Sequence, residues 1–222
     1  FIIINNYYFK LLIYFIIILR RFFNKKISYL IIGDFNNLFM RRFIDYSNNV
    51  VILDDGTNIF TFKKEIKNFL KNKSNIYFFS FFEKNYLGLK NHIQNNFDFI
   101  SSKVINFKKK NIIFILGTCW INTNLVKKED YKLLINAMAK KYMNNKIYYF
   151  PHPKENIELS KKILPQNFKI IKSNLNFETF LISQKIIPKL IIGFNTTSLI
   201  IIKKIFINKV KLLNYHLVIK KH

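Results

Sequence analysis

Short apolar segments that break off at a glycine, an acid or a histidine recur along this chain, and helical segments separate them. This alternation predicts an α/β fold with parallel sheets, because parallel neighbours are joined by a crossover that is usually a helix. The expected strands are 28–32, 50–53, 76–82, 111–116, 147–150, 169–171, 190–192 and 209–213. The expected helices are 38–46, 62–71, 129–142, 177–183 and 198–206.

The charged, asparagine-rich stretch 91–110 is the natural boundary between two domains. We therefore expect one domain at 1–105 and a second at 106–222, which begins with the strand at 111. Half of the 222 residues are hydrophobic, so the chain has enough apolar side chains to form a sizeable core.

A histidine between two prolines, His152, follows the expected strand at 147–150. Proline fixes its own φ and pushes the preceding residue to an extended conformation, so Pro153 holds the imidazole in one presentation. Open α/β sheets bind ligands beyond the ends of their strands. Histidine can donate a proton or bind a phosphate near neutral pH, which indicates a catalytic or phosphate-handling site. A simple turn is the alternative.

Two other expected strands also end in polar clusters. The strand at 50–53 ends in an acidic pair and a glycine, Asp54, Asp55 and Gly56. The strand at 190–192 ends in Gly193, followed by a polar cluster that opens an apolar helix. This cluster consists of Asn195, Thr196, Thr197 and Ser198. Hydroxyls at a helix start bind phosphate well, although they also serve as plain helix caps.

The acidic-acidic-Gly, His-Pro and hydroxyl motifs, in that order, resemble those of the bacterial sialyltransferases. The chain is most similar to the lipooligosaccharide sialyltransferase family, with the bacterial polysialyltransferases as relatives, over roughly residues 27–215. The resemblance implies a GT-B-like fold, in which two Rossmann-like domains face a cleft. The N-terminal domain would present the acceptor and the C-terminal domain would bind the nucleotide-sugar. The family is longer at its N-terminus, so we expect a truncated chain with an incomplete N-terminal domain.

The resemblance implies an enzyme that moves sialic acid from CMP-sialic acid to a terminal galactose of a bacterial surface glycolipid, with inversion. His152 would be the general acid and phosphate partner. Asp130, at an expected helix start, resembles the family's catalytic base, with Glu129 in its place if the register is off by one. In some sialyltransferase families the first acid of the acidic motif is the base, so Asp54 remains an alternative. Asp130 could also simply cap its helix.

Further residues resemble donor contacts. The hydroxyl cluster would hold the CMP phosphate, and Glu178 would accept a hydrogen bond from a ribose hydroxyl. Gly117 and Thr118 follow the first strand of the second domain, where a backbone turn could approach the donor. A relative that uses another sugar donor and an inactive fragment are the alternative interpretations.

The net charge of +25, from 37 Lys and Arg against 12 Asp and Glu, suggests nucleic-acid binding. We expect none, because Arg20, Arg21, Arg41 and Arg42 are the only arginines and base-edge contacts favour Arg. A basic surface would instead attract the anionic nucleotide-sugar and anionic membranes. The apolar run at 11–19 is short for a span of about 20 residues. We therefore expect a cytoplasmic protein at the periphery of the inner membrane, and leave a homodimer open.

Cofactor motifs are absent from the sequence. It contains no glycine-rich dinucleotide or ATP motif, no Asp-x-Asp motif, and no Cys and His at zinc-ligand spacing. We therefore expect no cofactor and no obligate metal. The single cysteine, Cys119, excludes an intramolecular disulfide and fits a reducing compartment.

Overall fold

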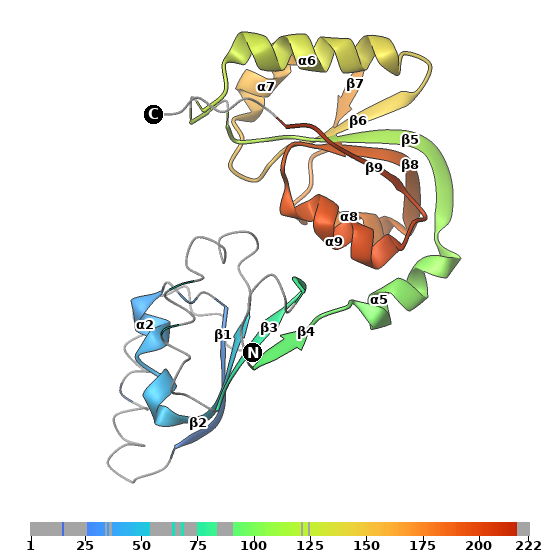
Figure 1. Cartoon of the computed structure of the whole chain (residues 1–222). Helices are drawn as coiled ribbons and strands as arrows, with labels where there is room; N and C mark the ends of the chain where they lie inside the picture. Colours follow the sequence, from blue (N-terminus) through green and yellow to red (C-terminus); the bar gives the residue numbers. More distant parts are fainter. Residues whose placement is uncertain are drawn as a thin grey trace. The chain divides into compact units, whose positions relative to one another are not determined.

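The computed structural model describes residues 26–53 without 34 and 36, 75–83, and 91–216 without 121 and 124, together with the isolated positions 15, 64 and 68. The chain divides into two compact units, Phe1–Asn95 and Asn96–His222. Both contain parallel sheets, so the expected α/β class is confirmed (Figure 1).

The described part of the first unit is a parallel sheet in the order β1-β2-β3-β4. Its elements are β1 (Ile27–Ile32), α2 (Leu38–Arg41), the 3₁₀ turn η1 (Ile44–Tyr46), β2 (Ser47–Leu53), β3 (Ile76–Ser80) and β4 (His92–Gln94). Alternate side chains of β2 and β3, such as Ile52 and Phe78, are buried. The acidic motif that follows β2 lies outside the described residues.

The second unit holds a five-stranded parallel sheet in the order β7-β6-β5-β8-β9. Its strands are β5 (Lys108–Leu116), β6 (Lys146–Phe150), β7 (Phe168–Ile170), β8 (Ile186–Gly193) and β9 (Lys211–Asn214). Its helices are α5 (Asp98–Lys103), the 3₁₀ turn η3 (Val104–Asn106), α6 (Lys128–Lys141), α7 (Ile157–Ile163), α8 (Phe177–Gln184) and α9 (Thr197–Phe206). Counted within the unit, this order is 3-2-1-4-5, as in Rossmann-like sheets.

Helices cover both faces of this sheet, because the side chains of its central strands alternate between two cores (Figure 1). Ile113 and Ile115 of β5 join Tyr131 of α6 on one face. Phe114 and Leu116 point to the other face, where α8 and α9 pack. A sheet buried on both faces explains why its strands are continuous apolar runs in the sequence.

The stretch predicted as a domain boundary is largely folded. It contains β4, α5, η3 and the start of β5, and along the sequence the first unit ends at Asn95 rather than at 105. Residues 108–110 pair with 186–188 of β8, while their lysine side chains stay exposed. The apolar pattern did not predict this part of the strand, because its three lysine side chains face water while only its backbone is paired.

Helix α7 was not expected from the sequence either. It is only seven residues long, and Asn156 starts it by accepting hydrogen bonds from the backbone of Glu158 and Leu159. In the part of the chain that the structure describes, no helix is both long and apolar enough to cross a bilayer.

Candidate functional site

A cavity of about 450 Å³ opens at the edge of the second unit where the strands end. It lies beyond β5, β6 and β8, beside the first turns of α8 and α9, and continues toward α5. β5 and β8 are neighbours in the sheet, and the connections that follow them run in opposite directions, from β5 to β6 and from β8 to β9. This is the switch point where open α/β sheets bind ligands. The lining residues include Phe97, Ile100, Leu116, Gly117, Phe150, His152, Pro153, Asn176, Phe177, Glu178, Ile182, Thr196, Thr197, Ser198, Ile201 and Ile205.

Seven of the residues predicted from the sequence line this one cavity. They are Gly117, His152, Pro153, Glu178, Thr196, Thr197 and Ser198. Thr118 and Asn195 are neighbours of lining residues but do not line it themselves. Thr118 is buried and accepts a hydrogen bond from the backbone of Trp120, and Asn195 is paired with Asn214.

His152 lies in a tight turn between β6 and α7. The backbone N–H of Lys154 donates to its Nδ1 at 3.1 Å, so the proton of the neutral imidazole is assigned to Nε2. Burial, and secondarily the charge of Lys154, lower the pKa of His152 below its ordinary value of 6.5. The side chain is therefore neutral at pH 7, and its Nε2–H can donate to a ligand.

Glu155 is a buried acid at the centre of a hydrogen-bond network that holds this turn. Its Oε1 accepts from the hydroxyls of Tyr149 and Ser160, each at 2.5 Å, and its Oε2 accepts from the backbone N–H of His152 at 2.9 Å. The Tyr149 hydroxyl also lies 3.1 Å from that of Tyr131 in α6. Burial nevertheless dominates and raises the pKa of Glu155.

Sequence reasoning did not identify Glu155, because an acid three residues after a histidine resembles an ordinary surface charge. One sequence signal does accompany it. A Cβ at Gly117 would overlap Glu155 Oε2 and the Tyr149 hydroxyl, so the glycine after β5 leaves room for the buried carboxylate.

The hydroxyl cluster forms the start of α9. Thr196 is the cap residue, and its Oγ1 accepts from the backbone of Ser198 at 3.3 Å. Asn195 adopts φ 48° and is held by Asn214 of β9, which accepts from its backbone N–H at 2.7 Å. This turn therefore presents a helix N-terminus and three hydroxyls to the cavity, an arrangement that suits a phosphate.

Glu178 adds a carboxylate on the α8 side of the cavity. It lies in the first turn of α8, where Asn176 caps the helix by accepting from Thr179 at 3.0 Å. Its side chain is 8% exposed and faces the cavity, so it can accept a hydrogen bond from a ligand hydroxyl.

The cavity has an apolar end as well as a polar one. Phe97, Ile100, Ile182, Ile201 and Ile205 line it toward α5 and the body of α9. Phe97 has the left-handed backbone φ of 57°, rare for an aromatic residue, just before α5. A ligand with a polar and an apolar part fits these surroundings.

The predicted base, Asp130, is not brought into the cavity. It lies exposed in the first turn of α6, which packs on the opposite face of the sheet through Tyr131. It does not cap the helix, because the capping position is Lys127 and no side chain bonds there. Asp54, Asp55 and Gly56 lie outside the described residues.

Within the described residues, no group of three His, Cys, Asp or Glu side chains is arranged to hold a metal ion. Comparison of the chain with models of known protein families and with curated proteins finds no match. The geometry of the cavity is therefore the basis for assigning a function.

Proposed function

We propose that this chain is a glycosyltransferase that moves sialic acid from CMP-sialic acid to a terminal galactose of a bacterial lipooligosaccharide or related glycan. One observation carries the proposal. His152 and the hydroxyl-rich start of α9 follow different strands, β6 and β8, and yet line the same cavity at the switch point of a Rossmann-like sheet. A histidine beside a hydroxyl-rich helix start suits a donor with one phosphate.

In the proposed binding mode, the CMP phosphate lies against the N-terminus of α9. Thr196, Thr197 and Ser198 donate hydrogen bonds to its oxygens, together with backbone N–H groups of the first helical turn. His152 donates from Nε2 to the phosphate oxygen that leaves with CMP. Glu178 accepts from a ribose hydroxyl.

The proposed reaction is a single displacement with inversion at the anomeric carbon of sialic acid. The galactose oxygen forms a bond to this carbon while the bond to the phosphate oxygen of CMP breaks. The hydroxyl proton goes to a carboxylate base, and the charge that develops on the departing phosphate is stabilised by the Nε2 hydrogen bond of His152. Proton donation from a cationic His152 would strengthen the same interaction.

We propose Asp130 as the base, with Asp54 as the alternative. Asp130 shares the strand-end edge of the sheet with His152, because β5 leads into α6 as β6 leads into α7. An acceptor sugar that reaches across this edge would bring its hydroxyl to Asp130. In this proposal the two units form a GT-B-like pair in which the first unit presents the acceptor.

Calorimetric titration of the full chain with CMP tests the first step, and transfer from CMP-sialic acid to a galactose-terminated acceptor tests the second. We expect the unmutated chain to bind CMP and to catalyse transfer. We expect the Thr196→Ala/Thr197→Ala/Ser198→Ala variant to bind CMP more weakly, by roughly 1–3 kcal/mol. Binding of UMP in preference to CMP would point to another donor. Binding of CMP without any transfer would make the chain an inactive relative.

A further inference from the structure

The edge of the second sheet opposite the cavity carries a band of lysines. Helices run antiparallel to the strands, so their C-terminal ends meet the starts of the strands at this edge (Figure 1). Exposed lysines stand at the starts of three strands, Lys108, Lys146 and Lys211. Further lysines close the helices: Lys103, Lys140, Lys141, Lys161, Lys162, Lys185, Lys203 and Lys204.

The acidic residues of the second unit lie at the other end of its helices. In the described range 96–216 they are Asp98, Glu129, Asp130, Glu155, Glu158 and Glu178. Each lies in the first turn of a helix or, for Glu155, directly before one. Lys161 pairs with Glu158 at 2.6 Å, while the other acids of this range lie toward the strand ends. The strand-start edge therefore carries a net positive charge.

The helix dipole explains part of this separation, because cations are stabilised at helix C-termini and anions at N-termini. It does not explain three exposed apolar side chains at the same edge, each in a different connection that leads into a strand. Ile105 precedes β5 and is 72% exposed, Met143 precedes β6 and is 72% exposed, and Ile207 precedes β9 and is 59% exposed. Ile207 also holds an unfavourable backbone φ of 33°.

We infer that this strand-start edge docks the protein on a bilayer that contains anionic lipids. Exposed apolar side chains between lysines suit a bilayer interface, where the lysines meet anionic headgroups and the apolar side chains enter the acyl boundary. A nucleic acid would use the lysines but would leave Ile105, Met143 and Ile207 in water. We define the lysines at 108, 146 and 211 with these three apolar residues as the docking edge.

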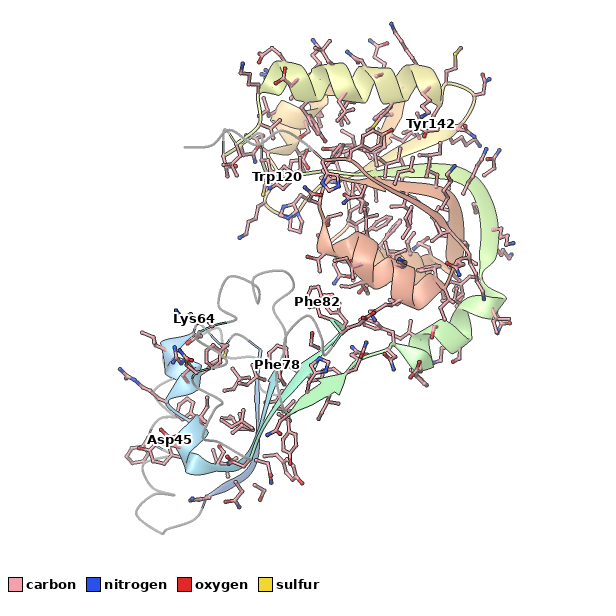
Figure 2. All side chains as sticks on the ribbon, viewed as in Figure 1. Asp45, Lys64, Phe78, Phe82, Trp120 and Tyr142 are labelled. Atoms are coloured by element: carbon pink, nitrogen blue, oxygen red, sulfur yellow. The ribbon has the colours of Figure 1, made fainter. Side chains whose placement is uncertain are left out.

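Docking here would leave the cavity open to the aqueous side. The nine residues of β5 separate the two edges by about 30 Å at ~3.3 Å per residue. Figure 2 labels Tyr142 near the docking edge and Trp120 at the other end of the sheet. The inference is therefore independent of what the cavity binds, and a His152→Ala variant should bind vesicles like the unmutated chain.

The test is co-sedimentation of the full chain with phosphatidylcholine vesicles that contain roughly a quarter phosphatidylglycerol. The charge variant is Lys108→Glu/Lys146→Glu/Lys211→Glu. Its matched control is Lys127→Glu/Lys128→Glu/Lys172→Glu, which changes the net charge equally at exposed positions of the opposite edge. We expect the edge variant to bind about tenfold more weakly or worse, and the control to bind much more strongly than the edge variant.

The apolar contribution needs its own variant, Ile105→Ser/Met143→Ser/Ile207→Asn. Asparagine tolerates a left-handed backbone, so the change at 207 relieves strain rather than adding it. We expect weaker vesicle binding that is lost more readily in salt, because electrostatic attraction alone would remain.

The orientation can be read from tryptophan fluorescence, because the sequence contains a single tryptophan. With brominated lipids, we expect no quenching of Trp120 and strong quenching in a Trp120→Phe/Met143→Trp variant. Circular dichroism of every variant would establish that it is folded. Equal loss of binding in the two lysine triples, quenching of Trp120, or an apolar variant that binds normally would overturn the inference, as would failure of the unmutated chain to bind the vesicles.

Discussion

His152 and Glu155 are joined by two hydrogen bonds in opposite directions. The backbone N–H of His152 donates to Glu155 Oε2 at 2.9 Å, and the backbone N–H of Glu155 donates to the carbonyl of His152 at 2.8 Å. Pro153 occupies the turn between them. Asn122 also donates to the carbonyl of Lys154 at 2.9 Å. The position of His152 is therefore held by hydrogen bonds of its backbone as well as by the hydrogen bond to its ring.

Replacement of His152 by alanine should lower turnover about 100-fold or more, because a proton donor or phosphate partner contributes on that scale. The turn should survive, since Glu155 bonds to the backbone and not to the imidazole ring. The measurement is transfer rate at saturating CMP-sialic acid, with thermal unfolding as the control for folding. Unchanged turnover in a well-folded His152→Ala variant would remove this residue from the chemistry.

Binding of a CMP phosphodiester, such as the methyl ester of CMP, should strengthen as the pH falls. Burial and the charge of Lys154 lower the pKa of His152, and a bound anion would raise it. Protonation therefore accompanies binding. The extra affinity is present below the pKa of the complex and is lost as the pH rises through it. Calorimetry across pH 5–8 checks this, with the phosphodiester chosen because its own charge is constant.

A pH-independent affinity of the unmutated chain would contradict a phosphate contact by His152. The matched control is His152→Gln, which keeps a hydrogen-bond donor but cannot titrate, and its affinity should be flat over the same range.

Replacement of Glu155 by glutamine should flatten the pH dependence of stability. Burial raises the pKa of Glu155, so the native state holds this proton to higher pH than the unfolded state. The contribution of this group to the free energy of unfolding is therefore fully present well below its ordinary pKa of 4.5. It is lost as the pH rises from there through the native pKa. Denaturant unfolding at several pH values checks this. We expect the free energy of unfolding of Glu155→Gln to rise relative to that of the unmutated chain as the pH rises.

Glu155→Ala serves as the contrasting variant. It leaves the Tyr149 and Ser160 hydroxyls and the His152 N–H without their buried acceptor, which costs about 1–3 kcal/mol for each group that stays unsatisfied. It should be destabilised at every pH. Equal stability of the glutamine and alanine variants would mean that the network does not hold the turn.

Removal of the hydroxyls at Thr196, Thr197 and Ser198 should weaken CMP binding by roughly 1–3 kcal/mol in total, through lost charge-assisted hydrogen bonds. Because Thr196 also caps α9, its loss alone should lower stability by about 1 kcal/mol. Thr197→Ala/Ser198→Ala, which keeps the cap, separates the two effects in the calorimeter. Unchanged CMP affinity in this double variant would reduce the cluster to a helix cap.

Asp130→Asn should abolish sialyl transfer and leave CMP affinity intact, because a base acts on the acceptor and not on the donor. Its exposed position in α6 makes the change harmless to folding. Glu178→Gln should behave differently and weaken CMP binding, since this carboxylate faces the cavity. Transfer rate against acceptor concentration, with CMP affinity beside it, distinguishes the two. Normal transfer by Asp130→Asn together with an inactive Asp54→Asn would assign the base to the acidic motif.

The sequence predicts strands that are buried on both faces, because such strands are continuous apolar runs. Most of the second sheet was predicted in this way, including β6, β8 and α9 to within a few residues. Elements with exposed or short apolar patterns were missed. The start of β5 carries lysines, and α7 depends on its Asn156 cap.

The sequence alone determined that glycines, hydroxyls and a proline-flanked histidine stand at the ends of strands, since local backbone chemistry requires these residue types there. Only the tertiary structure decided which of these ends meet. The strand order places β5 between β6 and β8, and so joins His152 with Thr196, Thr197 and Ser198 while it leaves Asp130 on the other face. The same packing gathers lysines from separate helix ends into one edge, and it buries Glu155 under Gly117. Contacts of this kind join residues that are distant in the chain, and strand order is a property of the packed sheet.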